Sequence, residues 1–276
     1  MRQKYPLLSV ALAVLCAVCV VATSIVSCSS PPKIASMTAE EQVRQDNTLG
    51  VRLSQKLEPQ LKIKKDLEVS VYLKRIADHL AAKTDALKIS PVGVFVVQDR
   101  TDLWKNYSIP GIRIYLSAGL LKGADYENEI AALIALEYAN VLNRNVLRRV
   151  EKILASRAES EGDTVPNALF PEKGALDKLS LDFFGQNGVF SYTEQEWLQA
   201  TEVAVKILYR AGYDPRGLVS VWQRYRDHSK NSPFETSSLN KFDDRAYLAI
   251  SANTPLRNPI VRSEAFLRIQ KRIRNL

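Results

Sequence analysis

The chain has 276 residues, of which 38 are basic and 30 are acidic, so it carries a formal net charge of +8. The basic residues are scattered along the sequence, which predicts ordinary solvated faces and no nucleic-acid partner. All three cysteines lie within the first 28 residues. The body that follows must therefore be stable without disulfides, and it is long enough to bury a core of its own.

The N-terminal segment has the layout of a secretory signal, because basic residues precede an uncharged apolar run, Leu7–Ala22. The sequence Ile25-Val26-Ser27-Cys28 then places small residues before a cysteine, as in the lipobox that bacteria cleave before they attach lipid to the cysteine. We predict that residues 1–27 form a lipoprotein signal peptide. Cys28 would then be the lipidated first residue of the mature protein.

Two other arrangements of this segment are weaker. Cys16 and Cys19 make poorer lipidation sites because Leu15 and Val18, which precede them, are too large for such a cleavage. An uncleaved signal anchor is the alternative, since an apolar run of this length could just span a bilayer.

A short tether is expected between the lipid and the body. Residues 28–37 are polar and contain prolines, which is typical of a spacer. Ser29, in place of an Asp beside the cysteine, favours the periplasmic face of the outer membrane within the bacterial cell envelope. Residues 38–276 would form the folded domain.

The first half of this domain is predicted to contain two helices and two strands. Thr38 and Glu41 have capping-box spacing before a loosely amphipathic helix. A second helix is expected over residues 66–83. Residues 91–97 are rich in β-branched side chains and predict a strand, and residues 112–116 alternate apolar with polar residues after a Pro-Gly turn.

Helices dominate the second half. The expected helices cover residues 128–145, residues 146–159, a segment from the Thr193 and Glu196 capping box to just before Gly212, a segment from Pro215 to about residue 225, and a basic amphipathic segment from about residue 261. The polar residues 159–174 predict a loop.

Three sequence blocks occur in an order and at spacings that are typical of one family. They are Ile109–Leu121 (IPGIRIYLSAGLL), Glu129–Val141 (EIAALIALEYANV) and Arg210–Arg216 (RAGYDPR). They resemble the "PGGxIYVxxGLL" strand and turn, the "ELAAVLAHEIAHV" active-site helix and the segment after the "ExEAD" helix of the gluzincin metallopeptidases, which include the β-barrel assembly-enhancing protease and the CaaX prenyl protease. The resemblance covers about residues 69–225. It implies an α+β fold, mainly helical and zincin-like, with a small β-sheet beside the active-site helix.

In that family, the two histidines of HExxH project from one helix face and bind one Zn²⁺, while the glutamate activates the metal-bound water. Aligned residue by residue, the first histidine falls on Leu136, the glutamate on Glu137 and the second histidine on Asn140. The third ligand, normally Glu, falls on Gln199, and the Asp two positions later falls on Thr201. Read without the family, the same stretch is part of an amphipathic helix that requires no site.

These substitutions predict that zinc, the cofactor of the family, is lost and that the chain holds no metal. A leucine side chain has no lone pair to offer, and neutral amide oxygens suit harder ions than zinc. His79 and His228 are the only histidines, and both lie outside the blocks, where surface roles are expected. Glu137 remains as a vestigial general base, which can contribute about 10²–10⁴-fold, far less than peptide hydrolysis requires. We therefore interpret the chain as a pseudoprotease.

The resemblance also implies a peptide-binding edge strand at Ile112, Arg113, Ile114 and Tyr115, where an extended segment would pair by β-augmentation. The expected partners are peptide segments or envelope proteins, bound for quality control or assembly without hydrolysis, and the membrane reached through lipidated Cys28. Two alternatives stay open. One is an active metalloendopeptidase with non-standard ligands, and the other is an envelope scaffold docked by its lipid anchor and its basic C-terminal helix.

Overall fold

The computed structural model describes residues 38–84, 93–111, 113–161 and 181–276. The helices and strands below lie in the unit Ala39–Leu276, which is distinct from Met1–Thr38. The predicted signal peptide, Cys28 and the predicted tether lie outside the described residues, so this division of the chain stays a prediction. Within the described ranges, no helix combines the length and the apolar character that crossing a membrane would need.

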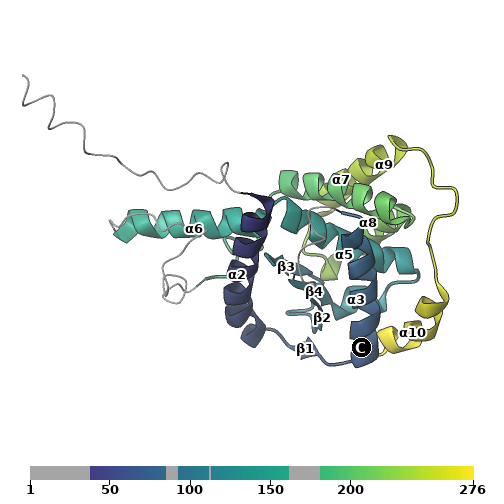
Figure 1. The fold of residues 1–276 in the computed structure, drawn as a ribbon, viewed down its shortest axis with the longest axis horizontal. Coiled ribbons are helices and arrows are strands. Elements are labelled where there is room, and N and C mark those ends of the chain that lie inside the picture. Colours follow the sequence, from purple (N-terminus) through teal and green to yellow (C-terminus); the bar gives the residue numbers. More distant parts are fainter. Residues whose placement is uncertain (1–37, 85–92, 112, 162–180) are drawn as a thin grey trace, which may run out of the picture. The chain divides into compact units, whose positions relative to one another are not determined.

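Four strands form one mixed sheet, in the order β1-β2-β4-β3 (Figure 1). The two strands expected from the sequence are β2 (Gly93–Val97) and β4 (Arg113–Ser117), which run parallel to each other. Two shorter strands were not predicted. β1 (Ile63–Lys64) pairs antiparallel with β2, and β3 (Tyr107–Ile109) pairs antiparallel with β4.

The order of the strands corrects the prediction that residues 112–115 form the edge of the sheet. β4 is an interior strand, because it pairs with β2 on one side and with β3 on the other. Arg113, Ile114 and Tyr115 therefore offer no open edge to a peptide. Ile112 lies outside the described residues. The strand at the end of the sheet, next to the helix that carries the second block, is β3.

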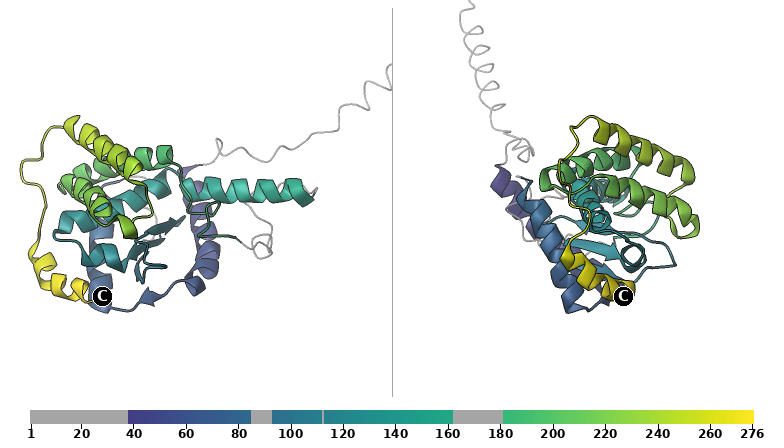
Figure 2. Two further views of the ribbon diagram at one scale, coloured as in Figure 1. Left: turned by 180° about the vertical axis from the view of Figure 1, so that it is seen from behind. Right: turned by 90° about the vertical axis from the view of Figure 1, so that its right-hand side faces the viewer.

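Helices pack on both faces of the sheet (Figures 1 and 2). The described helices are α2 (Ala39–Leu57), α3 (Leu67–Ala82), α4 (Ala118–Lys122), α5 (Glu127–Leu142), α6 (Asn145–Glu161), α7 (Glu194–Ala211), α8 (Arg216–Asp227), α9 (Thr236–Ser251) and α10 (Glu264–Arg274), with 3-10 turns at Glu58–Gln60 and Ser229–Asn231. Of these, α7 and α8 pack on α5, and α9 packs on α7 and α8. The short helix α4 and the helix α9 were not predicted. The capping box at the start of α7 is confirmed, since Thr193 and Glu196 bond reciprocally.

The sheet separates two hydrophobic cores, because successive side chains of a strand point to opposite faces. Ile114 and Leu116 of β4 belong to the larger core, which they share with α3, α5 and α7 to α10. Tyr115, between them, belongs to a smaller core with α2, α6 and side chains of the segment 181–190.

The same alternation in β3 prepares the candidate site. Tyr107 and Ile109 pack into the smaller core, so Ser108 is turned to the opposite face, toward α5. α5 lies between the sheet and the layer of α7 and α8 (Figure 2). As a result, every residue of α5 from Glu127 to Asn140 is buried.

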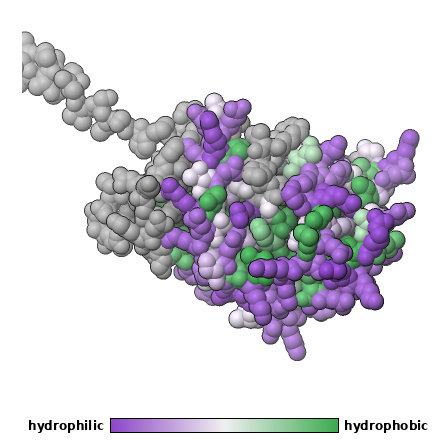
Figure 3. Space-filling model, turned by 60° about the horizontal axis from the view of Figure 1, so that its bottom comes forward, coloured by the Kyte–Doolittle hydropathy of each residue, from purple (hydrophilic) through white to green (hydrophobic). Residues whose placement is uncertain are grey.

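The predicted fold class is confirmed: the chain is α+β and mainly helical, with a small sheet beside the helix that carries the second block. On the face drawn in Figure 3, hydrophobic side chains lie interspersed among hydrophilic ones.

Candidate functional site

The middle of α5 buries the positions on which the zinc-binding motif falls. Leu136, Glu137 and Asn140 are each at most 2% exposed. Helical spacing places Leu136 and Asn140 one turn apart on one face. Glu137 Oε2 accepts hydrogen bonds from Ser108 Oγ at 2.7 Å and from Asn140 Nδ2 at 3.4 Å. β3 and α5 thus hold the carboxyl group in a small polar cluster within an apolar interior.

Burial controls the ionisation of this cluster. It raises the pKa of Glu137 to about 7, and the hydrogen bonds from Ser108 and Asn140 and the charge of Lys105 oppose this only in part. Burial also lowers the pKa of the Lys105 ammonium, and here the charge of Glu137 acts in the opposite direction. The raised pKa extends the pH range in which Glu137 is protonated, and a protonated carboxyl can donate as well as accept a hydrogen bond.

A chain of hydrogen bonds leads from Asn140 to the start of α7. Asn145 Nδ2 donates to Asn140 Oδ1 at 3.0 Å, and Arg148 donates to the Asn145 side chain. Arg148 Nη2 also lies 3.4 Å from Glu196 Oε1, in the first turn of α7. Both polar atoms of the Asn140 side chain are therefore engaged within the protein, one with Glu137 and one with Asn145.

The structure corrects the predicted third ligand position, Gln199. Gln199 lies on the exposed face of α7, whereas Trp197, Ala200 and Thr201 lie on its buried face. The "ExEAD" motif has Glu at its first and third positions and Asp at its fifth. When the Asp is aligned with Thr201, the two Glu positions fall on Trp197 and Gln199. Only Trp197, one helical turn before Thr201, faces the interior. The inward acidic position of the motif is therefore occupied by an indole ring.

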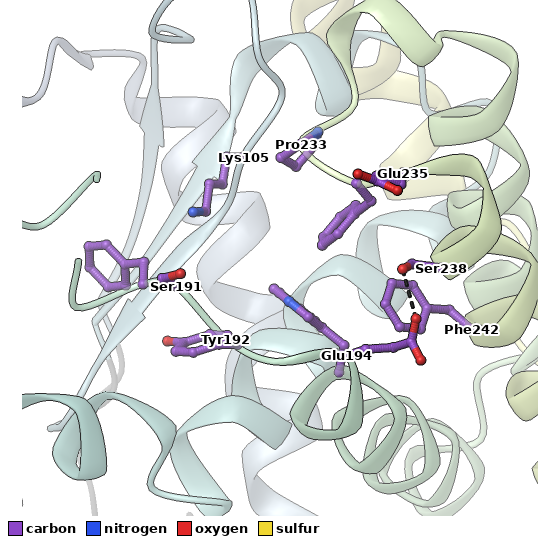
Figure 4. A pocket seen from close by; sticks show the side chains of 11 residues that line it. Lys105, Ser191, Tyr192, Glu194, Pro233, Glu235, Ser238 and Phe242 are labelled. Atoms are coloured by element: carbon purple, nitrogen blue, oxygen red, sulfur yellow. Dashed lines mark hydrogen bonds between the residues drawn. The ribbon is translucent and has the colours of Figure 1, made fainter. Parts of the chain in front are cut away.

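A pocket of about 220 Å³ has Lys105 in its wall (Figure 4). Its lining residues come from the segment before β3, from the segment before α7 and the start of α7, and from the segment before α9 and the start of α9. They are Lys105, Phe190, Ser191, Tyr192, Glu194, Trp197, Pro233, Phe234, Glu235, Ser238 and Phe242. The charge of Glu137 acts on both Lys105 and Tyr192. The Tyr192 ring is 5.4 Å from the Trp197 ring, centroid to centroid. Trp197, at the inward acidic position of the motif, is therefore also part of the pocket wall.

Residues before α7 cover part of β3. The centroid of the Tyr107 ring lies 5.4 Å from that of Phe184 and 4.9 Å from that of Phe190. The Arg100 guanidinium lies 4.0 Å from the centroid of the Phe184 ring. The Tyr107 side chain is consequently buried, while Ser108 is buried on the opposite face, toward α5. A peptide that pairs with β3 has to displace some of this cover.

The family is established by a family model, that of peptidase family M48, which matches residues 70–246, from α3 to α9. The chain belongs to peptidase family M48. It is 22% identical over 163 residues to the beta-barrel assembly-enhancing protease of Yersinia pestis, and 21% identical over 165 residues to that of Escherichia coli (strain K12). Each match covers 58% of this chain and 33% of the relative, so the chain spans about a third of the length of these relatives. The metallopeptidase resemblance of the three blocks is confirmed.

M48 peptidases normally bind zinc, and the side chains of this M48 chain do not fit that ion. Zinc is held by cysteine sulfur, histidine nitrogen or carboxylate oxygen. Leu136 offers none of these, the amide of Asn140 is committed to two hydrogen bonds, and the indole of Trp197 can only donate. Among the residues that the structure describes, no three His, Cys, Asp or Glu side chains form a group that could hold a metal ion.

Both histidines of this M48 chain have other contacts. His79 is half-buried, and its Nε2 lies 2.8 Å from the carbonyl oxygen of Ala211, so it links α3 to the end of α7. This corrects the expected surface role of His79. His228 is exposed, as expected, and its ring lies 5.0 Å from that of Trp104, centroid to centroid.

Sequence reasoning missed Ser108 and Lys105, and it placed the third ligand position on Gln199 instead of Trp197. Ser108 lies on a strand of only three residues, which is too short to give a periodic pattern. No motif in the sequence singles out Lys105. The inward position of Trp197 did have a signal, because Trp197, Ala204 and Leu208 share one stripe of helical spacing with Thr201.

Proposed function

We propose that this M48 chain is a catalytically inactive, lipid-anchored protein of the bacterial cell envelope that binds extended polypeptide segments without cleaving them. One observation carries the proposal. The three inward ligand positions hold an aliphatic side chain, an amide already committed to two hydrogen bonds, and an indole ring, at Leu136, Asn140 and Trp197. These three side chains offer a hydrolytic metal ion no suitable ligands, although the fold around them is that of the family.

Glu137 alone does not support peptide hydrolysis. A positioned general base contributes about 10²–10⁴-fold, whereas enzymes typically accelerate their reactions by about 10⁶-fold or more. Its carboxyl group is also buried and already accepts hydrogen bonds from Ser108 and Asn140. A water molecule therefore has to replace one of these bonds before it can be activated.

The binding surface that we propose is the outer edge of β3. β3 ends the sheet, and Ser108 joins it to Glu137 on the former active-site helix. A peptide added to such an edge gains main-chain hydrogen bonds, and pockets beside the edge select its side chains. The relatives are named for enhancing β-barrel assembly. Unfolded envelope polypeptides, met on the periplasmic face of the outer membrane, are therefore the partners to test first.

The test uses the full chain purified in detergent. Short extended peptides and unfolded barrel proteins are added in the presence of zinc and, separately, of a chelator. Binding is followed by fluorescence anisotropy, and the mass of the recovered peptide by mass spectrometry. We expect binding under both conditions and recovery of the peptides at full mass.

Two results contradict the proposal in different ways. Cleavage that the chelator abolishes would identify an active metalloendopeptidase with non-standard ligands. Failure to bind any peptide or unfolded protein would leave a scaffold lipoprotein as the better interpretation.

A further inference from the structure

The pocket beside the Glu137 cluster has a rigid aromatic wall. The Phe234 ring makes edge-on contacts with Trp197 at 5.1 Å, with Tyr225 at 5.3 Å and with Trp222 at 5.8 Å, centroid to centroid. Phe242 packs on Phe234 in the same way, at 5.6 Å. Rings held from several sides keep their positions and present a preformed apolar surface to a ligand.

The opposite side of the pocket carries an ammonium group that no described residue contacts by a hydrogen bond or an ion pair. The Lys105 ammonium makes no hydrogen bond or ion pair with the described residues, and its nearest aromatic contact is the Tyr107 ring, 6.0 Å from Nζ to the centroid. Figure 4 shows Lys105 and Ser191 on the side of the pocket away from Glu235, Ser238 and Phe242. A partly buried ammonium group without an acceptor is unfavourable, so it favours an anionic ligand.

Neither acidic residue of the pocket wall, Glu194 or Glu235, serves as the anionic partner of Lys105. Glu194 is engaged elsewhere, since its carboxylate accepts from Lys241 Nζ at 2.8 Å and from Ser238 Oγ at 2.8 Å. Glu235 is exposed at the rim and lies across the pocket from Lys105 (Figure 4). Glu137 lies in the neighbouring cluster, where Ser108 and Asn140 are its hydrogen-bond donors.

We propose that this pocket binds the C-terminal residue of a polypeptide. Its α-carboxylate would lie against the Lys105 ammonium, within reach of the Ser191 hydroxyl, and its apolar or aromatic side chain would pack against Trp197 and Phe234. This inference rests on the proposed function, because it names the part of the polypeptide that the site selects.

The position of Lys105 fits the C-terminal end of a bound peptide. Lys105 precedes the first residue of β3, Tyr107, by two residues. A peptide that pairs antiparallel with β3 therefore brings its C-terminal end to Lys105. The size of the pocket agrees, since about 220 Å³ is below the roughly 300–1,000 Å³ of sites for drug-sized ligands, but suits a single terminal residue.

The test compares two forms of one short extended peptide that ends in phenylalanine, one with a free C-terminal carboxylate and one amidated. Binding to the full chain in detergent is measured by fluorescence anisotropy. A hydrogen bond to a charged group changes affinity by about ten- to hundredfold. We therefore expect the free acid to bind at least about tenfold more tightly than the amide. Lys105→Met should remove this difference, and Lys105→Arg should keep it. Lys122→Met, at an exposed lysine on α4, is the matched control and should leave it unchanged.

The outcomes separate this inference from the proposed function. If both peptide forms bind equally well to the unmodified protein, the pocket does not recognise a C-terminus, although the protein still binds peptides. If neither form binds, both proposals fall. If N-acetylphenylalanine competes as well as the whole peptide, the pocket takes small carboxylates instead of chain ends, and the inference is overturned.

Discussion

Glu137 illustrates how a buried acidic residue can act on the stability of the fold. Its carboxyl group is buried beside Ser108 and Asn140, with a pKa of about 7 against an ordinary value of 4.5. The folded state therefore holds this proton more tightly than the unfolded state does. Stability contributed by the group is present below about pH 4.5, falls as the pH rises toward 7, and stays low at higher pH.

The variant Glu137→Gln is expected to remove this pH dependence. A glutamine stays neutral and can still accept from Ser108 and Asn140. It should therefore stabilise the protein above pH 7.5 by up to about 3 kcal/mol, and change its stability little below pH 4.5. The measurement is the free energy of unfolding in urea at a series of pH values.

Glu129→Gln is the matched control on the same helix. The Glu129 carboxylate is buried but accepts from Arg224 Nη2 at 2.8 Å. Removal of its charge leaves the buried guanidinium only the longer ion pair with Asp125, at 3.9 Å, so this variant should be less stable at neutral pH. A loss of stability for Glu137→Gln at pH 8 would show that the ionised carboxylate is favoured by the fold, contrary to our account.

If Trp197 occupies the third ligand position, three substitutions should be able to restore zinc binding. The triple variant Leu136→His, Asn140→His and Trp197→Glu should bind zinc, because all three new side chains face the same interior region. The same variant with Gln199→Glu in place of Trp197→Glu should bind zinc at least about tenfold more weakly, since the third carboxylate lies on the exposed face of α7.

Metal content after dialysis and the rise in Tm on addition of zinc report on both variants. The rise in Tm matters because loss of the buried Trp197 ring is itself expected to destabilise the apo protein. Equal zinc affinity of the two triple variants would restore Gln199 as the ligand position.

At the scale of elements, the cover on β3 is what a peptide has to displace. The Phe184 ring lies on Tyr107 and belongs to the segment before α7. An aromatic contact of this kind is worth about 0.5–1.5 kcal/mol, so Phe184→Ala should tighten peptide binding by about two- to tenfold. Phe95→Ala is the control, because that ring stacks on Tyr115 of the interior strand β4. Unchanged or weaker peptide binding by Phe184→Ala would argue against pairing at β3.

Local signals in the sequence predicted most elements, but not how strands and helix faces meet. The Thr193 and Glu196 capping box fixed the start of α7, because its hydrogen bonds are local. That β4 lies inside the sheet depends on β3, a three-residue strand whose pairing is set by tertiary contacts. α9 also has a helical pattern of apolar residues, at Leu239, Phe242 and Ala246, but it was not predicted.

The candidate site likewise contains residues that the sequence predicted and residues that only the structure places there. A motif match located Glu137 on its helix, because spacing along one helix is fixed by its geometry. Choosing between Trp197 and Gln199 requires the rotation of α7 about its axis, which the motif does not give. Lys105 enters the site only because β3 and the segment before α7 are brought together by packing. Contacts between distant segments are therefore the part that sequence reasoning could not supply.

At the scale of the whole molecule, the proposed role depends on how the domain is held in the envelope. The lipobox reading attributes this to Cys28, since acyl chains contribute about 0.8 kcal/mol of membrane affinity per buried CH₂ group. We expect the unmodified protein to incorporate labelled palmitate and Cys28→Ser to lose the label. Cys16→Ser and Cys19→Ser, whose preceding residues are Leu15 and Val18, should keep it. If the Cys28→Ser protein still carries the label, another residue is the lipidation site. If the unmodified protein is unlabelled and retains Met1, an uncleaved signal anchor is the better interpretation.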